Sequence, residues 1–174
     1  FTITTSPAGR LLVAATDRGV CAVELGDDEG VLAAALAEEF PRAALARDDG
    51  ALRRLALQVV EAVEGTGHQT IPLDLRGTAF QLRVWGALRE IPRGETRSYA
   101  AIARRLGNPK ASRAVAAACA ANRVALLVPC HRVVRGDGEP GGYRWGAERK
   151  QRLLAAEALT PGARPGGLDA IRSP

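Results

Sequence analysis

Short apolar runs separated by turn residues make up the first 25 positions of the chain. Runs at 1–4, 10–15 and 20–25 are apolar or alternate with polar residues, and turn sequences such as Asp17-Arg18-Gly19 lie between them. This pattern is typical of strands joined by tight turns. Apolar residues then recur at helical spacing over 31–40 and 51–63, the first segment after an acidic run at 27–29. The pattern predicts a small antiparallel sheet followed by two helices.

The periodicity breaks at 65–77, where glycines and a proline predict a linker between two lobes. Beyond it, the apolar spacing predicts a helix over 78–91, then a short helix that Ser98 caps and that runs to 106. A tight connection of glycine, asparagine, proline and lysine at 107–110 leads to a further helix over 111–121. Two helices joined by a short glycine-containing turn form the helix-turn-helix pattern.

An apolar run at 125–128 leads into Pro129, Cys130 and His131 and reads as a buried strand. A glycine-rich turn follows at 136–138, and a final helix is predicted over 147–159. Residues 160–174 are rich in proline and glycine, which predicts a flexible tail. We therefore expect an N-terminal supporting lobe at 1–76, a second lobe at 77–159 and the tail.

Composition indicates a folded protein outside the membrane. The chain has 174 residues, 47% of them hydrophobic, and no stretch approaches the roughly 18 unbroken apolar residues of a membrane span. No basic and apolar leader is visible, so we expect the protein in the cytoplasm. Lys+Arg number 24 against 19 Asp+Glu, a balance that suits a polyanionic partner without requiring one. The chain has no methionine, so we expect the native start to lie upstream.

Three widely spaced cysteines argue against a disulfide framework and against a zinc site of the Cys-x-x-Cys kind. We expect Cys21 and Cys119 to be packing residues, and His68 to be a solvated loop residue with no partner at ligand spacing. No metal or other cofactor is expected.

Cys130 is the candidate nucleophile, because a buried strand that ends in Pro-Cys-His places its thiol at the rim of the core. The alternative is a small buried apolar residue, which a free cysteine usually is. Neighbouring residues of an extended chain point to opposite faces, so His131 is expected to reach the thiol through a water or a twisted backbone. A thiol with the ordinary pKa of about 8.5 is only a few per cent ionised at pH 7, so efficient attack needs a base nearby.

The segment Pro129-Cys130-His131-Arg132-Val133, with the helix-turn-helix pattern before it, resembles the O6-alkylguanine-DNA alkyltransferase family. The resemblance covers residues 1–158 and is strongest to the C-terminal half of the Ada-type adaptive-response protein. Further segments at the family's spacing are Gly77-Thr78-Ala79-Phe80, Val84-Trp85, Ile91-Pro92-Arg93-Gly94-Glu95-Thr96, Ser98-Tyr99, Gly107-Asn108-Pro109-Lys110 and Gly142-Tyr143.

The resemblance implies an α+β fold, with a ribonuclease H-like N-terminal sheet lobe and a C-terminal winged helix-turn-helix lobe. It also implies repair of alkylated DNA, in which a minor-groove-binding lobe flips the damaged guanine into a pocket and Cys130 attacks the O6-alkyl carbon. The thioether product is a poor leaving group, so each molecule is expected to act once. O4-alkylthymine stays open as a second substrate. The expected partner is double-stranded DNA containing O6-alkylguanine, and the expected state is a monomer.

The implied recognition helix carries Arg113 and presents Ala114, Ala117 and Ala121 to DNA. A minor groove is only about 6 Å wide and a helix about 10–12 Å across, so the helix must be thin and the groove must open. Arg113 matches the finger that fills the gap in the base stack, with a plain phosphate contact as the alternative. For the alanines the alternative is helix propensity and close packing. Tyr99 matches the tyrosine that assists flipping and protonates the leaving guanine, and a structural role is its alternative.

The resemblance further implies a relay from Cys130 through a water to His131 and then to Glu157, the acid that holds the histidine. Glu148, nearer the start of the same helix, is the alternative acid. Asn122 matches an asparagine at the end of the recognition helix, where a left-handed backbone is tolerated and the amide can orient the nearby backbone and His131.

The implied guanine pocket is lined by residues on both sides of the nucleophile, and Arg144 departs from the family's pattern. Some members have a serine there, whose hydroxyl can bond the lesion oxygen. The pocket residues are Pro129, Val133, Gly142, Tyr143 and Arg144.

Two other classes of protein remain alternatives. An alkyltransferase-like lesion sensor binds damaged bases without an acceptor cysteine, and Cys130 speaks against it. A plain winged-helix transcription regulator would not need Cys130, His131 and Glu157 in register with Tyr99.

Overall fold

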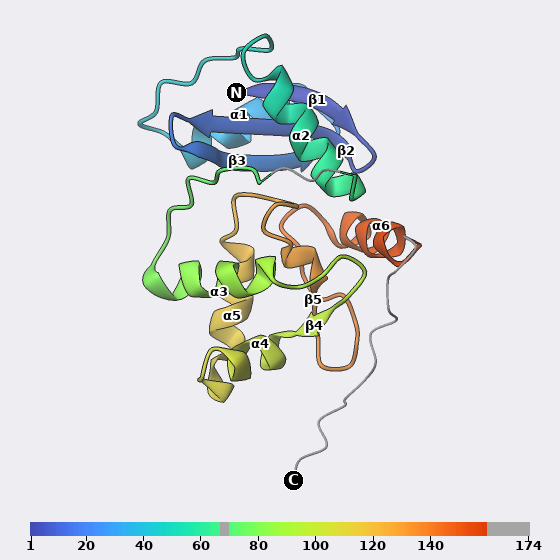
Figure 1. The fold of residues 1–174 in the computed structure, drawn as a ribbon. Coiled ribbons are helices and arrows are strands. Elements are labelled where there is room, and N and C mark those ends of the chain that lie inside the picture. Colours follow the sequence, from blue (N-terminus) through green and yellow to red (C-terminus); the bar gives the residue numbers. More distant parts are fainter. Residues whose placement is uncertain (67–69, 160–174) are drawn as a thin grey trace.

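The computed structural model describes residues 1–66 and 70–159 of an α+β protein (Figure 1). His68 and the tail at 160–174, for which we predicted a solvated position and flexibility, lie outside the described residues. Within the described part of the chain, no helix is both long and apolar enough to cross a bilayer. Two regions lie one above the other in Figure 1: a sheet region with two helices, and a helical region.

The sheet region has three antiparallel strands in the order β1-β2-β3, with bounds Thr2–Ser6, Gly9–Thr16 and Gly19–Gly26. Helices α1 (Glu29–Glu39) and α2 (Arg53–Glu64) follow, on opposite faces of the sheet in Figure 1. This arrangement explains why Leu11, Leu12 and Val13 are all fully buried: successive strand residues point to opposite faces, and both faces are covered. The predicted sheet and helices are confirmed.

The segment after α2 is more than a spacer. Gly65 ends the helix with a positive φ of 78°, as helix-terminating glycines commonly do. The chain then runs along β3, where Val20 donates its N–H to the Pro72 carbonyl at 2.9 Å and Asp74 donates to the Val20 carbonyl at 2.8 Å. Gly19 is required at this contact, because a Cβ there would lie 2.4 Å from the Pro72 oxygen. Part of the predicted linker is therefore built onto the sheet.

The helical region begins with α3 (Ala79–Arg89), where Thr78 and Gln81 form a reciprocal capping box. A two-residue strand, β4 (Arg97–Ser98), leads into α4 (Tyr99–Arg105), and Ser98 accepts the N–H of Ala101 as the helix cap. The later elements are η1 (Pro109–Ala111), α5 (Ser112–Ala120), η2 (Cys130–Arg132), β5 (Val133–Val134) and α6 (Ala147–Ala158). Strand β5 pairs in parallel with β4. The predicted helices are present, with ends that differ by one to a few residues.

The predicted buried strand at 125–128 is wrong. The segment is a series of turns, in which Leu126 has a left-handed backbone with φ 70° and Leu127 donates its N–H to the Ala125 carbonyl at 2.7 Å. Cys130 then starts a 3-10 helix. Four apolar residues in a row form the same sequence pattern in a strand and in a turn, so periodicity does not separate the two. Here the Asn122 side chain bonds the Val128 carbonyl and the Val124 N–H, and Val128 donates its own N–H to the Val124 carbonyl within the turns.

One hydrophobic core joins the two regions. Val23 of β3 donates to the Arg123 carbonyl at 2.8 Å, and Ala125 donates back to the Val23 carbonyl at 3.1 Å, so the chain after α5 is hydrogen-bonded to the sheet. Buried residues of this core from the two regions include Leu11, Val13, Val23, Val59, Val84, Trp85, Ile102, Val115 and Val128.

Candidate active site

Cys130 lies in the core with only 4% of its surface exposed. The Nδ2 group of Asn122 donates a hydrogen bond to its Sγ at 3.1 Å. Burial raises the pKa of the Cys130 thiol to about 11, while the hydrogen bond from Asn122 and the nearby charge of Lys150 oppose that rise. The thiol is therefore neutral at pH 7, and ionisation needs a base.

The side chain of Asn122 also holds the backbone that leads to Cys130. Its Nδ2 also donates to the Val128 carbonyl at 2.9 Å, and its Oδ1 accepts the N–H of Val124 at 2.9 Å. Our expectation of a left-handed Asn122 is wrong, since Leu126 is the non-glycine residue with positive φ within the described ranges. The amide also bonds the thiol and the backbone rather than His131. Asn122 therefore contacts the candidate nucleophile itself, whereas the sequence suggested that it orients His131 and the nearby backbone.

His131 is 1% exposed, and its Nε2 lies 3.0 Å from Oε1 of Glu157. Burial lowers the pKa of the imidazole, which favours the neutral ring. A carboxylate only accepts hydrogen bonds, so Nε2 must carry the ring proton and Nδ1 must carry a lone pair. Nδ1 is buried and has no hydrogen-bond partner among the described residues. His131 therefore presents an unprotonated nitrogen in the interior.

Glu157 of α6 accepts several hydrogen bonds besides the one from His131. Arg132 donates to both carboxylate oxygens, from Nε at 2.9 Å and from Nη2 at 2.8 Å, and the Gly94 N–H lies 3.3 Å from Oε2. The hydrogen bonds from His131 and Arg132 hold the pKa of Glu157 far below its usual range despite its burial. Glu148, the alternative acid, is exposed at the start of α6 and pairs with Arg152 at 3.7 Å.

Lys150 is a site residue that our sequence reasoning missed. Its side chain is completely buried, and its ammonium group donates to the Val133 carbonyl at 2.5 Å and to the carbonyls of Pro140 and Gly142. Burial lowers the pKa of this ammonium group. The ion thus ties the strand after Cys130 to the loop at 140–142. One signal was available: the chain has almost only arginine as its basic residue, yet keeps a lysine here.

Some of the residues predicted to line the guanine pocket lie beside Cys130 or His131. The Tyr143 ring meets the His131 ring edge-on, with centroids 6.5 Å apart, and the Trp145 ring at 5.0 Å. Pro129 and Val133 are buried on either side of the 3-10 helix that carries Cys130. Arg144 turns to the sheet region instead, where its Nη2 lies 2.6 Å from Oε2 of Glu39. Its guanidinium group is therefore engaged in an ion pair.

Tyr99 is half-buried at the start of α4. Its hydroxyl lies close to the same loop, because a Cβ on Gly141 would be 3.4 Å from the Tyr99 oxygen. Burial raises the pKa of the Tyr99 phenol, so it stays protonated at neutral pH. Tyr99 and Lys150 thus both lie against the short loop that leads into Tyr143.

The outer face of α5 is lined by small side chains. Arg113, Ala114 and Ala117 are exposed, Ala121 is half-buried, and Ala120, which was not among the predicted DNA contacts, is also exposed. The opposite face packs into the core, where Trp85 donates its indole N–H to the Ala118 carbonyl at 2.8 Å. The alanines therefore serve both explanations, close packing inside and a thin surface outside.

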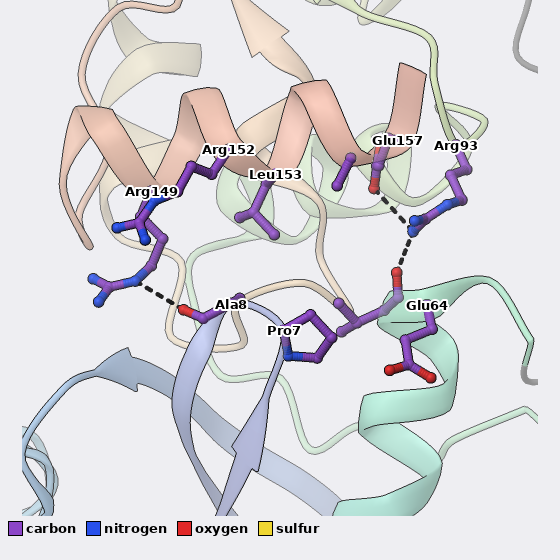
Figure 2. A pocket seen from close by; sticks show the side chains of 10 residues that line it. Pro7, Ala8, Glu64, Arg93, Arg149, Arg152, Leu153 and Glu157 are labelled. Atoms are coloured by element: carbon purple, nitrogen blue, oxygen red, sulfur yellow. Dashed lines mark hydrogen bonds and ion pairs between the residues drawn. The ribbon is translucent and has the colours of Figure 1, made fainter. Parts of the chain in front are cut away.

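A cavity of about 100 Å³ lies between α6, α2 and the β1–β2 turn (Figure 2). Glu157 lines it, together with residues that include Arg93, Arg149 and Leu153. Cys130, Tyr99 and Tyr143 do not line it, so it is separate from the predicted guanine pocket. Within residues 1–66 and 70–159, no cluster of three or more histidine, cysteine or acidic residues could hold a metal ion.

The chain is similar to proteins that are named as methyltransferases of methylated DNA. A family model described as "6-O-methylguanine DNA methyltransferase, DNA binding domain" matches residues 79–159. The Escherichia coli bifunctional transcriptional activator/DNA repair enzyme Ada is 52% identical over 151 residues, which cover 86% of this chain and 43% of that protein. The inducible methylated-DNA–protein-cysteine methyltransferase of Bacillus subtilis is 46% identical over 121 residues, which cover 69% and 68%.

The solved structure of Mycobacterium tuberculosis OGT in complex with DNA has a TM-score of 0.76 and 37% identity, and the match covers 90% of this chain and 91% of that one. The chain therefore belongs to the methylated-DNA–protein-cysteine methyltransferase family, which confirms the resemblance found in the sequence. It spans less than half the length of the Ada-type relatives that it matches.

Proposed function

We propose that this protein repairs DNA by transferring the alkyl group of O6-alkylguanine, methyl above all, to its own Cys130. The observation that carries this proposal is the geometry around the thiol. Asn122 holds Sγ in a buried position, and the neighbouring His131 presents an unprotonated Nδ1 while Glu157 holds its other nitrogen. This arrangement is a buried acceptor with a built-in base, which neither a lesion sensor nor a plain transcription regulator needs.

The first step is deprotonation of Cys130. A bridging water passes the thiol proton to Nδ1 of His131, and the Glu157 carboxylate stabilises the imidazolium through Nε2. With a thiol pKa of about 11, only about one molecule in ten thousand carries a thiolate at pH 7. Proton transfer must therefore accompany binding of the lesion, which keeps the buried thiol inactive toward other electrophiles.

The second step is alkyl transfer. The Cys130 thiolate attacks the alkyl carbon, the S–C bond forms as the C–O6 bond breaks, and the electron pair of that bond leaves with guanine. Tyr99 donates a proton to the departing ring and regains one from the His131 imidazolium through solvent. The net proton moves from Cys130 to guanine. The thioether that forms is a poor leaving group, so the Cys130 thiol is not regenerated and the reaction occurs once per molecule.

We further propose that 1–76 and 77–159 are the two lobes of the protein, ribonuclease H-like and winged helix-turn-helix respectively. In this proposal α4 and α5 form the helix pair, and the small outer face of α5 enters the minor groove of double-stranded DNA. Arg113 fills the gap left by the flipped base. The protein acts as a monomer, because one thiol and one DNA-binding face suffice for the reaction. Its proposed location is the cytoplasm.

Intact-protein mass spectrometry after mixing with an oligonucleotide that contains O6-methylguanine tests the proposed function. We expect one methyl group per chain, located on Cys130 by peptide mapping. Cys130→Ala should gain none, and the matched control Cys119→Ala should gain one, since the side-chain amide of Asn122 bonds the thiol of Cys130 and not that of Cys119. Methylation of Cys119, or turnover beyond one equivalent, would contradict the proposal.

A further inference from the structure

Glu39, the last residue of α1, contacts two separate segments of the helical region. Its Oε1 lies 2.5 Å from Nε of Arg123, and its Oε2 lies 2.6 Å from Nη2 of Arg144. The Glu39 side chain is only 18% exposed. Charge-assisted hydrogen bonds are stronger than neutral ones, and the two that Glu39 accepts are partly shielded from water. One carboxylate thus links positions 123 and 144, which lie on either side of Cys130 in the sequence.

The two arginines adjoin the groups that handle the thiol. Arg123 directly follows Asn122, whose amide bonds the Cys130 sulfur. Arg144 directly follows Tyr143, whose ring contacts His131. A shift of either arginine therefore moves a residue beside the reacting atoms.

A second carboxylate reinforces the link. Glu24 of β3 is 5% exposed, accepts the indole N–H of Trp145 at 2.5 Å and lies 3.7 Å from Arg144. The segment from 142 to 145 has no helix or strand of its own. Lys150 holds its start through the Gly142 carbonyl, and the two carboxylates of the sheet region hold its end.

We propose that Glu39 is a positioning residue, through which the sheet region fixes the wall of the alkylguanine pocket at 142–145 and so restricts the size of the alkyl group accepted. This inference rests on the proposed function. The sheet region then has a definite part in the reaction: it holds the wall against the segment that carries Asn122. Without the ion pair, the wall can move outward, which makes room for a larger group and orients a methyl group less well.

The test compares rates of transfer to Cys130 from O6-methylguanine and from O6-benzylguanine, both supplied as free bases so that DNA binding plays no part. We expect Glu39→Gln to raise the benzyl-to-methyl rate ratio roughly five-fold, within the range of measured couplings between contacting residues. Arg144→Gln should raise it similarly. The double variant should show no further rise, because both changes break the same contact. Glu39→Asp, which keeps the charge, should restore part of the selectivity.

Asp27→Asn is the matched control. Asp27 also forms an ion pair between the two regions, with Nη2 of Arg149 at 2.9 Å. Arg149 donates to the Trp145 carbonyl of the wall through its other terminal nitrogen, Nη1, at 2.8 Å, and that hydrogen bond does not involve Asp27. Loss of the Asp27 ion pair should leave the ratio unchanged, whereas a general weakening of the contact between regions would alter it. Thermal unfolding of each variant checks folding, and if Glu39→Gln does not fold, Arg144→Gln decides.

The outcomes separate the two proposals. If the wild-type protein accepts no alkyl group from either base or from alkylated DNA, the proposed function fails and the role of Glu39 falls with it. If the wild type reacts but Glu39→Gln and Arg144→Gln keep its ratio, only the role of Glu39 is wrong. An equal change in Asp27→Asn would likewise overturn it.

Discussion

At the scale of single residues, the protein keeps its candidate nucleophile in the neutral form. Cys130 is buried, its pKa is raised to about 11, and its contacts are the amide of Asn122 and its own backbone. Reactivity therefore depends on His131, whose Nδ1 lone pair follows from the hydrogen bond between Nε2 and Glu157. A buried, neutral thiol is unreactive by itself, so in the proposed reaction Cys130 attacks only when His131 takes its proton.

The raised pKa predicts a loss of stability at high pH. Unfolding returns the Cys130 thiol to its ordinary pKa of about 8.5, so its contribution is complete below that pH and is lost as pH rises toward 11. Between pH 8 and pH 10 the wild type should therefore lose more unfolding free energy than Cys130→Ala, by on the order of 1–2 kcal/mol. Urea unfolding at the two pH values measures this, and equal losses would mean that the thiol is not shielded. Cys119 is present in both proteins and cancels.

At the scale of elements, α5 combines a packed inner face with an outer face of small side chains. The exposed positions include Arg113, Ala114, Ala117 and Ala120. Such a helix is narrow where the proposed DNA contact lies. In the proposed complex a wider α5 would bind DNA less well, although the stability of the protein would not change.

Ala117→Leu should widen the helix without disturbing the core. We expect transfer from O6-methylguanine in duplex DNA to slow at least about ten-fold, since a loss of 1.4 kcal/mol in DNA binding already has that effect. Transfer from the free base should stay at the wild-type rate. Ala37→Leu, an exposed alanine on α1, is the control and should change neither rate. Equal slowing on both substrates would mean that α5 does not enter the groove.

Most elements were predictable from the sequence because each has a local signal. Short apolar or alternating runs between turn residues indicated β1–β3, and Ser98 marked the start of α4. The turns at 125–128 were not predictable, because their hydrogen bonds come from the Asn122 side chain, from Val23 of the sheet and from within the turns, and not from a repeating backbone pattern.

The same limit applies to the candidate site. Its residues in recognisable motifs were found, whereas Lys150, Glu24 and Glu39 act through contacts that are distant in sequence. Periodicity carries no information about such contacts.

At the scale of the whole molecule, the two regions share one core and a backbone link through Val23 and Val124. Small domains with a common core usually unfold in one step. The link also carries the segment that begins at Asn122. The sheet region is therefore integral to the site.

Urea unfolding monitored by two probes should give one coincident transition. Both tryptophans, Trp85 and Trp145, lie in the helical region, whereas far-UV circular dichroism reports on both regions. Val23→Ala should lower both midpoints together, by an amount typical of a buried truncation. Two separate transitions would show that the regions fold independently.

The pairing of β3 also bears on how much of this protein a cell can safely contain. Its outer edge is occupied by Pro72 and Asp74 at one end and by Arg123 and Ala125 at the other, and at the opposite side of the sheet Asp48 donates to the Phe1 carbonyl. Unpaired strand edges recruit other chains and cause aggregation. Under the proposed function one molecule is consumed per lesion, so DNA is protected only as far as the copy number allows. Covering the edge of β3 removes one route by which the folded protein could aggregate as that number rises.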